Sequence, residues 1–197
     1  MSLYKTSKHS SVELTATLPH MDLVERCKQG DTSCFRKLYD LYSKAMFNTS
    51  YRILNDFTEA EDVLQESFID AYRHLDSFGS RSSFGSWLKQ IVVNKSINVL
   101  RKRKLQTVDI DFTMAAEVPD EKGPDEQEIQ YKVEEVKRAI QQLPDGYRTV
   151  LSLYLLEGYD HEEISQIMQL AESTVRTQYM RAKQKLIHII KTGGTHV

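Results

Sequence analysis

The sequence predicts an all-α protein: two small helical domains joined by a flexible acidic linker, with a helix-turn-helix in the C-terminal domain. Apolar residues recur at helical spacing along most of the chain, and alternating strand patterns are nearly absent. An acidic segment with two prolines and one glycine interrupts this spacing near the middle. With 197 residues, 40% of them hydrophobic, the chain can bury two cores.

These breaks divide the chain into five segments. Residues 1–20 are expected to form a flexible N-terminus, and residues 192–197 a short tail. A first helical domain is expected over 21–105, and a second, which carries the helix-turn-helix, over 131–191. Residues 106–130, with no sustained period, form the linker.

Four helices are expected in the first domain. A short one runs from Met21 to Gln29 and is closed by Gly30. Asp31 is a suitable N-cap for a longer helix that continues to about Leu54. The core candidates of this second helix are Phe35, Leu38, Leu41, Tyr42, Ala45 and Phe47.

A third helix is expected to start at a capping box of Thr58 and Glu61 and to end near Leu75. A fourth helix follows a Gly- and Ser-rich loop and runs from about Ser83 to Lys104. The core stripe of the third helix is predicted to be Leu64, Phe68, Tyr72 and Leu75.

In the second domain, Pro144 separates a helix that ends near Leu143 from one that runs from about 145 to 157 and is ended by Gly158. Two further helices then form the helix-turn-helix. A capping box of Asp160 and Glu163 starts the first, and Ser173 is a good N-cap for the second, which reaches Lys191.

The charge distribution keeps nucleic-acid binding open although the formal net charge is −2. Residues 106–130 hold eight acidic residues and one basic residue, and both helical domains are mildly basic. Cys27 and Cys34 have no metal-binding spacing and are expected to be reduced core thiols. The sequence has no signal-peptide core and no apolar run of membrane-spanning length, which favours a cytoplasmic protein without membrane insertion.

No pattern in the chain indicates an enzyme. The sequence lacks a Gly-rich phosphate loop, paired catalytic carboxylates with a histidine, and a nucleophile motif. The six histidines are scattered without ligand spacing. We therefore expect no catalytic residue, no metal and no cofactor.

The last predicted helix has the pattern of a DNA-reading helix. Its apolar stripe comprises Val175, Tyr179, Ala182, Leu186 and Ile189. Ser173, Thr177 and Met180 lie opposite, Arg176 and Arg181 flank them, and the helix has five basic residues and no acidic one. Such a surface suits a major groove, although a plain amphipathic helix of a bundle gives the same stripe.

The outer face of the third helix suits a protein partner better than DNA. Asp62, Gln65 and Glu66 surround Ile69 there, and phosphates would be repelled by the carboxylates. An exposed apolar residue in a polar setting can anchor a partner, while a solvated face with one stray isoleucine is the alternative.

The fourth helix, SFGSWLKQIVVNKSINVLRKRK, has two apolar stripes with a narrow polar ridge between them. Gln90, Asn94, Asn98 and Arg101 form this ridge, and a cluster of four cations ends the helix. The ridge could read base edges or backbone, and the cations suit phosphates. A surface helix end is the simpler alternative.

These stretches resemble a known family. The segments EAEDVLQESFIDAYRHLDSF and SSFGSWLKQIVVNKSINVLRKRK resemble the promoter −10-reading domain of extracytoplasmic-function (ECF) sigma factors. LPDGYRTVLSLYLLEGYDHEEISQIM and STVRTQYMRAKQKL resemble the −35-reading domain of the same family. The resemblance implies a dissociable subunit that directs bacterial RNA polymerase to promoters and promotes −10 strand separation.

The resemblance also implies roles for individual residues. The third helix, through Asp62, Gln65, Glu66 and Ile69, would dock on the clamp helices of the polymerase largest subunit. The implied −10 residues are Arg81, Ser82, Ser83, Phe84, Trp87, Asn94, Asn98 and Arg101. The implied −35 residues are Ser173, Arg176, Thr177, Met180 and Arg181, with Arg148 and Thr149 at flanking phosphates.

The implied partners are core polymerase (clamp helices and flap), promoter DNA and an anti-sigma factor. The acidic linker resembles the family's linker in the RNA exit path, and its charge would mimic RNA there. Three positions depart from the family: Gln169 stands where glycine is usual, Arg81 where an acidic residue is frequent, and Met180 where relatives vary. A dimeric helix-turn-helix regulator is the competing interpretation, but a linker of 25 residues would not fix half-site spacing.

Overall fold

The computed structural model describes residues 20–79, 82–106 and 133–192, and the side chains of these except 104–106. The expected linker, the tail beyond Thr192, nearly all of the N-terminal segment and Arg81 lie outside the described residues. Within the described residues the structure is all-α, as the sequence predicts, and contains no strand.

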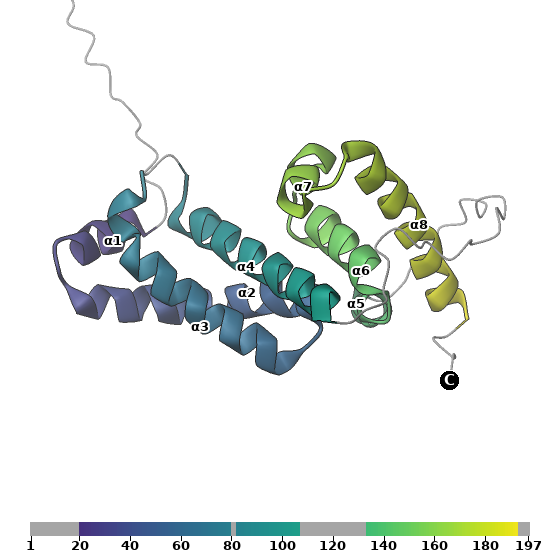
Figure 1. Cartoon of the computed structure of the whole chain (residues 1–197). Helices are drawn as coiled ribbons and strands as arrows, with labels where there is room; N and C mark the ends of the chain where they lie inside the picture. The colour runs from purple at the N-terminus through teal and green to yellow at the C-terminus, as the bar shows by residue number, and fades with distance from the viewer. Residues whose placement is uncertain (1–19, 80–81, 107–132, 193–197) are drawn as a thin grey trace, which may run out of the picture.

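The first group of helices comprises α1 (Met21–Lys28), α2 (Thr32–Leu54), α3 (Phe57–Arg73), a 3-10 turn η1 (Leu75–Ser77) and α4 (Phe84–Gln106). Figure 1 shows α2, α3 and α4 side by side as long rods, with α1 across one end. The expected boundaries of α1 and α2 are confirmed within one residue, and Asp31 caps α2 by accepting a hydrogen bond from the Ser33 amide.

The expected start of α3 is wrong by two residues. Asp56, not Thr58, has the extended backbone of an N-cap, and its Oδ1 accepts a hydrogen bond from the Glu59 amide at 2.9 Å. An Asp satisfies the free amides of a first turn as well as a Thr does, so the earlier candidate determines the start. The helix also ends at Arg73, before η1, rather than at Leu75.

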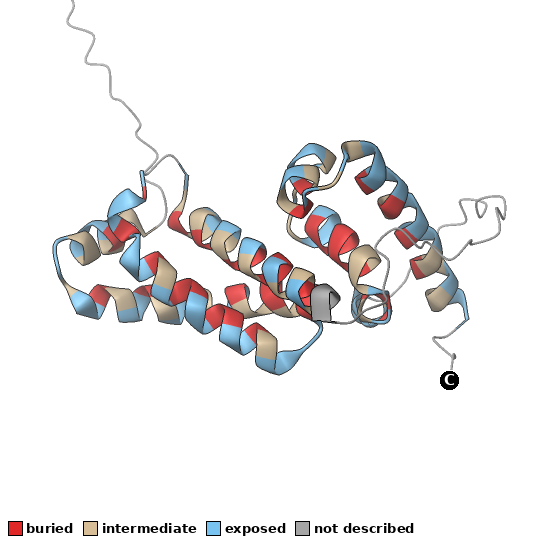
Figure 2. Cartoon of the chain, viewed as in Figure 1, coloured by how far each residue is buried: buried red, intermediate tan, exposed pale blue. Residues whose placement is uncertain are grey.

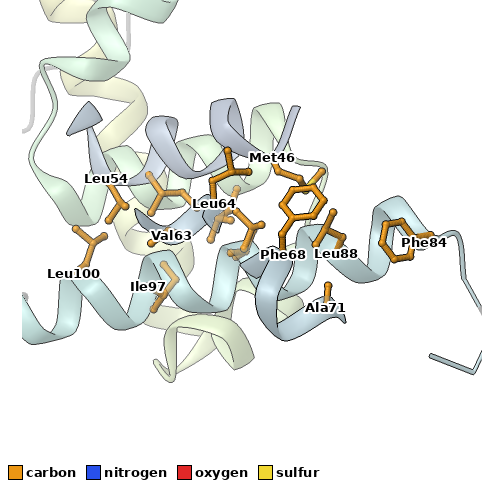
Figure 3. Packing of buried hydrophobic residues seen from close by; sticks show 14 of the residues in the cluster. Met46, Leu54, Val63, Leu64, Phe68, Ala71, Phe84, Leu88, Ile97 and Leu100 are labelled. Carbon is orange, nitrogen blue, oxygen red and sulfur yellow. The ribbon is translucent and has the colours of Figure 1, made fainter. Parts of the chain in front are cut away.

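Apolar side chains from α2, α3 and α4 meet along the rods and form the core of this first domain. Figure 2 shows the buried residues on the facing sides of these helices, and Figure 3 shows how Leu64 and Phe68 point toward the other helices. Helix α4 passes close to α2 at Gly85, where an added Cβ would lie 2.6 Å from the ring of Tyr42. Glycine at this position therefore permits the close approach of the two helices.

Three predicted core residues are not in the core. Leu41 is 50% exposed, Tyr72 is 51% exposed, and Ala45 is also exposed. Helical periodicity places all three near an apolar stripe, but they lie at edges of the stripes of α2 and α3 that face solvent.

The second group of helices comprises α5 (Val133–Gln141), α6 (Asp145–Leu151), a π-helical turn η2 (Ser152–Leu156), α7 (His161–Met168) and α8 (Glu172–Lys191). The helix expected over 145–157 is thus α-helical only in its first half. The wide turn is closed by a hydrogen bond from the Glu157 amide to the Ser152 carbonyl, and Gly158, at φ +81°, turns the chain away.

The helix-turn-helix is confirmed, with one boundary corrected. Asp160 and Glu163 form the expected capping box of α7, and Gln169 ends that helix in the left-handed conformation at φ 53°. The expected cap of α8, Ser173, is wrong because the helix begins at Glu172 after Ala171. Ser173 lies within the first turn, and its carbonyl accepts a hydrogen bond from the Thr177 hydroxyl.

The two groups of helices pack against each other rather than standing apart. Helix α6 lies against α2, and α7 lies against α4 (Figure 1). The main hydrophobic cluster continues from the first group into Val150, Leu153, Ile164 and Met168 of the second. A smaller cluster of Ile140, Leu143, Leu151, Ala182 and Leu186, with Ala139, joins α5, α6 and α8.

Candidate nucleic-acid and protein interfaces

The outer face of α8 gathers the polar residues predicted to read DNA. Ser173, Arg176, Thr177, Met180 and Arg181 are all exposed, and Met180 is 55% exposed. Val175, Ala182 and Leu186 on the opposite side are buried, so the core fixes which face points outward. The structure therefore brings these five predicted residues together on one accessible helix face.

Arg176 has a partner that the sequence pattern did not reveal. Its guanidinium pairs with the Glu172 carboxylate, with an Nη2–Oε1 distance of 2.5 Å and an Nε–Oε1 distance of 3.0 Å. Because α8 begins at Glu172, the two residues are one turn apart and face each other. This pair orients the arginine at the N-terminal end of the helix.

Arg148 and Thr149, the predicted flanking phosphate contacts, are not on this surface. Arg148 is 3% exposed and Thr149 is fully buried. The Arg148 guanidinium donates to the carbonyls of Leu143 at 2.8 Å and Ile53 at 3.2 Å, and it also pairs with Asp145. In this conformation no phosphate can reach either residue.

The polar ridge of α4 is only partly available. Asn94 and Asn98 are exposed, as the ridge requires. Arg101 is half-buried because one of its Nη atoms donates to the Asn98 side chain and the other to the Ile167 carbonyl at the end of α7. Helix α7 therefore covers the end of this ridge.

The start of α4 is held by an aromatic cluster. Phe78, Phe84 and Trp87 lie with ring centroids 5.2 to 6.0 Å apart. Phe78 and Phe84 are buried, whereas Trp87 is partly exposed and Ser82 is exposed. Phe84 is therefore a support for the loop, and Trp87 is the ring of this cluster that a base could reach.

The outer face of α3 has the predicted composition. Asp62, Gln65, Glu66 and Ile69 are all exposed, and Ile69 is 50% exposed. Val63, Leu64 and Phe68 are buried on the other side of the helix. An apolar side chain surrounded by carboxylate and amide groups is thus presented to solvent.

Lys95 of α4 anchors the acidic side of this face. Its Nζ lies 2.8 Å from the Asp70 carboxylate and 3.3 Å from that of Glu66. The hydrogen bond from Lys95 lowers the pKa of Asp70 below its ordinary value. Burial works to lower the pKa of Lys95, but its bonds to the two carboxylates outweigh burial and raise it. Asp70 and Lys95 therefore both stay charged at neutral pH.

A cluster of charged and polar residues between the two groups of helices was missed by sequence reasoning. The Glu157 side chain, only 5% exposed, pairs with Arg52 at 2.6 Å and accepts a hydrogen bond from Thr49 at 3.2 Å. Lys89 donates to the Glu157 carbonyl at 2.9 Å. We call Thr49, Arg52, Lys89, Arg148 and Glu157 the interdomain latch.

The latch could not be found in the sequence because its hydrogen bonds join residues about 70 to 110 positions apart along the chain. Glu157 follows an apolar run and precedes a glycine, which is the ordinary pattern of a helix end. Only the tertiary fold brings it between α2 and α4.

Among the described residues, no group of three or more His, Cys, Asp or Glu side chains could hold a metal ion. Both cysteines are free thiols, and burial raises the pKa of Cys27 to about 11. In the part of the chain that the structure covers, no helix combines the length and the apolar character needed to cross a membrane.

Two family models match the chain in the order of its two groups of helices. Sigma-70 region 2 matches residues 38–106, which include most of α2 and all of α3 and α4. Sigma-70 region 4 matches residues 133–186, which run from α5 into α8.

Curated relatives match over nearly their whole length. The RNA polymerase sigma-H factor of Pseudomonas aeruginosa is 36% identical over 173 residues, which cover 83% of this chain and 90% of the relative. The ECF RNA polymerase sigma factor SigW of Bacillus subtilis is 30% identical over 177 residues, with 83% and 92% covered. The ECF RNA polymerase sigma-E factor of Haemophilus influenzae is 33% identical over 175 residues, with 83% and 91% covered.

Solved structures share the fold at lower identity. The sigma factor RpoE of Bartonella quintana, solved in complex with the anti-sigma factor NepR, superimposes with a TM-score of 0.52 at 22% identity over 80% of this chain and 96% of that one. CnrH, solved in complex with the cytosolic domain of CnrY, gives a TM-score of 0.52 at 21% identity over 87% and 96%.

Proposed function

This chain belongs to the ECF subfamily of sigma-70-type RNA polymerase sigma factors. We propose that the exposed faces of α8 and α4 bind promoter DNA and that the exposed face of α3 binds the polymerase. As a sigma factor, it directs core RNA polymerase to specific promoters for transcription initiation. It is a transcription initiation factor, and we propose that it has no catalytic residue of its own and acts in the cytoplasm, where polymerase and promoters meet.

Helix α8 is proposed to read the −35 element in the major groove. The observation that carries this proposal is the accessible row of Ser173, Arg176, Thr177, Met180 and Arg181 on one helix face. Guanidinium and hydroxyl groups at the N-terminal end of a helix are suited to base edges and phosphates.

Helix α4 and the loop before it are proposed to bind the −10 element and to promote strand separation. Asn94 and Asn98 are exposed along one ridge, and Trp87 offers an accessible ring near Ser82 and Ser83. Stacking of a flipped base on an aromatic ring contributes ~1–3 kcal/mol, which is of the size needed to offset unstacking. Phe84 supports this loop from within the core.

Helix α3 is proposed to dock on the clamp helices of the polymerase largest subunit. Ile69 would enter an apolar site, and Asp62 and Glu66 would face basic groups of the partner. Gln65, which is exposed beside them, can donate and accept hydrogen bonds.

Further partners follow from the exposed face of the second domain and from the solved relatives. The polymerase flap is proposed to bind the second group of helices, where Leu155 and Leu156 are exposed. An anti-sigma factor is proposed to hold the chain inactive, since the sigma factor RpoE, which shares this fold, was solved in complex with the anti-sigma factor NepR.

The docking of α3 can be tested with purified bacterial core polymerase. We expect Ile69→Glu to reduce core binding and promoter-dependent transcription by about tenfold or more, because it places a charge in an apolar contact. Leu41→Glu is a matched control: Leu41 is equally exposed, at 50%, but belongs to a different helix, α2. Equal loss in both variants, or no loss in Ile69→Glu, would contradict the assignment of α3.

A further inference from the structure

Trp87 is the only tryptophan of the chain and the partly exposed member of the aromatic cluster at the start of α4. Its ring packs against two buried rings, Phe78 at a centroid distance of 5.2 Å and Phe84 at 5.8 Å. A ring at the surface keeps one orientation only while the close-packed neighbours beneath it stay in place. The direction in which Trp87 presents its exposed part is therefore set by the contacts that fix Phe78 and Phe84.

The C-terminal end of α1 holds Phe78. The Lys28 ammonium group donates a hydrogen bond to the Phe78 carbonyl at 3.0 Å and lies over the Phe78 ring, 5.7 Å from its centroid. One cation thus fixes both the backbone and the ring of Phe78, through a charge-assisted hydrogen bond and a cation–π contact. The Lys28 side chain is 21% exposed, so it is partly desolvated and these contacts are stronger than those of a lysine in bulk water.

The N-terminal end of α1 reaches Phe84 through one intermediate residue. His20, the N-cap residue of α1, is joined to Tyr42 of α2 by a hydrogen bond of 2.8 Å between its Nδ1 and the Tyr42 hydroxyl. The Tyr42 ring packs edge-on against Phe84 at a centroid distance of 5.4 Å. Both ends of α1 therefore act on the supports of Trp87, one directly and one through Tyr42.

We propose that α1 positions Trp87 for strand separation at the −10 element, with Lys28 and His20 as the positioning residues. Sigma-70 region 2 matches the chain only from residue 38, after α1, so the family match assigns this helix no role. A base that stacks on a ring already held in place does not have to pay for ordering that ring. Helix α1 thereby favours the open complex through Trp87. The link to strand separation rests on the proposed role of Trp87, whereas the packing of Trp87 does not.

The fluorescence of the single tryptophan tests the positioning in the full-length free protein, without DNA. We expect Lys28→Met to raise the acrylamide quenching constant of Trp87 by about twofold, because methionine loses the hydrogen bond and the cation–π contact. Lys28→Arg keeps a cation and should restore most of the wild-type value. Lys37→Met, at an exposed position on α2, is the matched control and should leave quenching unchanged.

His20→Phe tests the other end of α1. It keeps a ring beside Tyr42 but loses the hydrogen bond, so it should raise quenching less than Lys28→Met does. The double variant should exceed either single variant, since the two ends act through different supports. Circular dichroism and thermal unfolding would verify that each variant is folded. A folded Lys28→Met or His20→Phe with wild-type quenching would overturn the positioning role of that residue.

Open-complex formation by the holoenzyme is the second readout, followed with 2-aminopurine in the −10 non-template strand of a promoter that the wild-type holoenzyme melts. Lys28→Met should slow opening by about fivefold and leave core binding and closed-complex affinity unchanged, because Lys28 acts on the ring that stacks after the duplex opens.

The same substitution should have no further effect in a Trp87→Ala background, since both changes act on one contact. Slowing that persists without Trp87 would overturn the proposed path from α1 through Trp87. A Trp87→Ala holoenzyme that opens the promoter at the wild-type rate would overturn the role of Trp87 at the −10 element, and with it the link from α1 to strand separation. The quenching measurements would then still decide whether α1 positions the ring.

Discussion

At the scale of single residues, Glu172 shows how an acidic group can serve a DNA-reading face. Its pair with Arg176 holds the guanidinium at the start of α8, where the axis of the helix would point into a groove. In a complex with DNA, the Glu172 carboxylate would be close to phosphates, which carry the same charge. It must therefore either release Arg176 or point toward the base edges. Arg181 has no such neighbour among the ion pairs that the structure shows and is simply exposed.

We expect Arg176→Ala and Arg181→Ala to weaken promoter binding by the holoenzyme, each by about 1–3 kcal/mol if the arginine contacts bases. The loss should be concentrated at particular −35 positions, because base-edge contacts depend on sequence and phosphate contacts do not. Transcription from a set of promoters substituted at each −35 position measures this.

Lys183→Ala is the matched control, since Lys183 is an exposed cation two turns after Arg176, closer to the C-terminal end of α8 than the five proposed reading residues. It should change binding little and uniformly. If Arg176→Ala weakens binding to all the substituted promoters equally, Arg176 contacts phosphate, and the other residues of the face read the bases.

Residue roles were predicted from the sequence where burial followed from local periodicity. The outward direction of Arg176 and Ile69 is set by the apolar stripe of their own helix, and both predictions of exposure are confirmed. Arg148 could not be placed in this way. Its burial depends on Ile53 of α2, which only the tertiary fold brings near.

At the scale of elements, the turn between α7 and α8 is held by a residue that is poorly suited to it. Gln169 adopts φ 53°, ψ 45°, a left-handed conformation that costs a non-glycine residue about 1–2 kcal/mol. Its amide and that of Leu170 still satisfy the last carbonyls of α7. These hydrogen bonds hold the turn, and with it the angle between α7 and α8, despite the backbone strain.

Gln169→Gly should raise the free energy of unfolding by roughly 0.5–1 kcal/mol, because glycine removes the left-handed strain but loses more chain entropy on folding. Gln166→Gly, in the middle of the same helix and exposed, should lower it by about 1 kcal/mol. Denaturant unfolding of both variants measures the difference. A loss of stability in Gln169→Gly would mean that the side chain contributes more than its backbone strain costs.

The helices themselves were predicted well because each has an apolar stripe of 3.6-residue period. Their ends were predicted less well because more than one residue near an end can serve as the cap. Asp56 and Thr58 are both good caps for α3, and the sequence does not show which residue takes the extended backbone. The π turn at Ser152–Leu156 was also missed, since a wide turn preserves the composition of an ordinary helix.

At the scale of the whole molecule, the sequence correctly predicts two sets of helices but not that they share a core. A cluster that runs from Leu64 and Leu88 into Val150 and Ile164 makes the second group part of the same packed body. Each of these contacts joins distant parts of the chain, and no local pattern reports it. The resting shape of the molecule is a property of this interface.

The interface combines charged contacts with apolar packing, and salt can separate the two contributions. Raising NaCl from about 0.1 M to about 1 M shortens the Debye length from ~10 Å to ~3 Å and weakens the partly exposed Arg52–Glu157 pair. We therefore expect NaCl to lower the closed fraction of the wild-type protein, which is the fraction of molecules whose two groups of helices are packed together. Energy transfer between dyes attached through Lys44→Cys on α2 and Lys183→Cys on α8 measures this fraction. Glu157→Gln, which has no such pair, should respond less.

Sodium sulfate at matched ionic strength should lower the closed fraction less than NaCl does, because sulfate strengthens the burial of apolar surface while it screens charge. Val150 and Leu153, both fully buried, supply that apolar contribution. If wild type and Glu157→Gln respond equally to NaCl, the charges of the latch do not hold the domains together. The shared apolar core would then be the only element that closes the protein, and core polymerase would have to separate packed side chains before α8 could reach a −35 element.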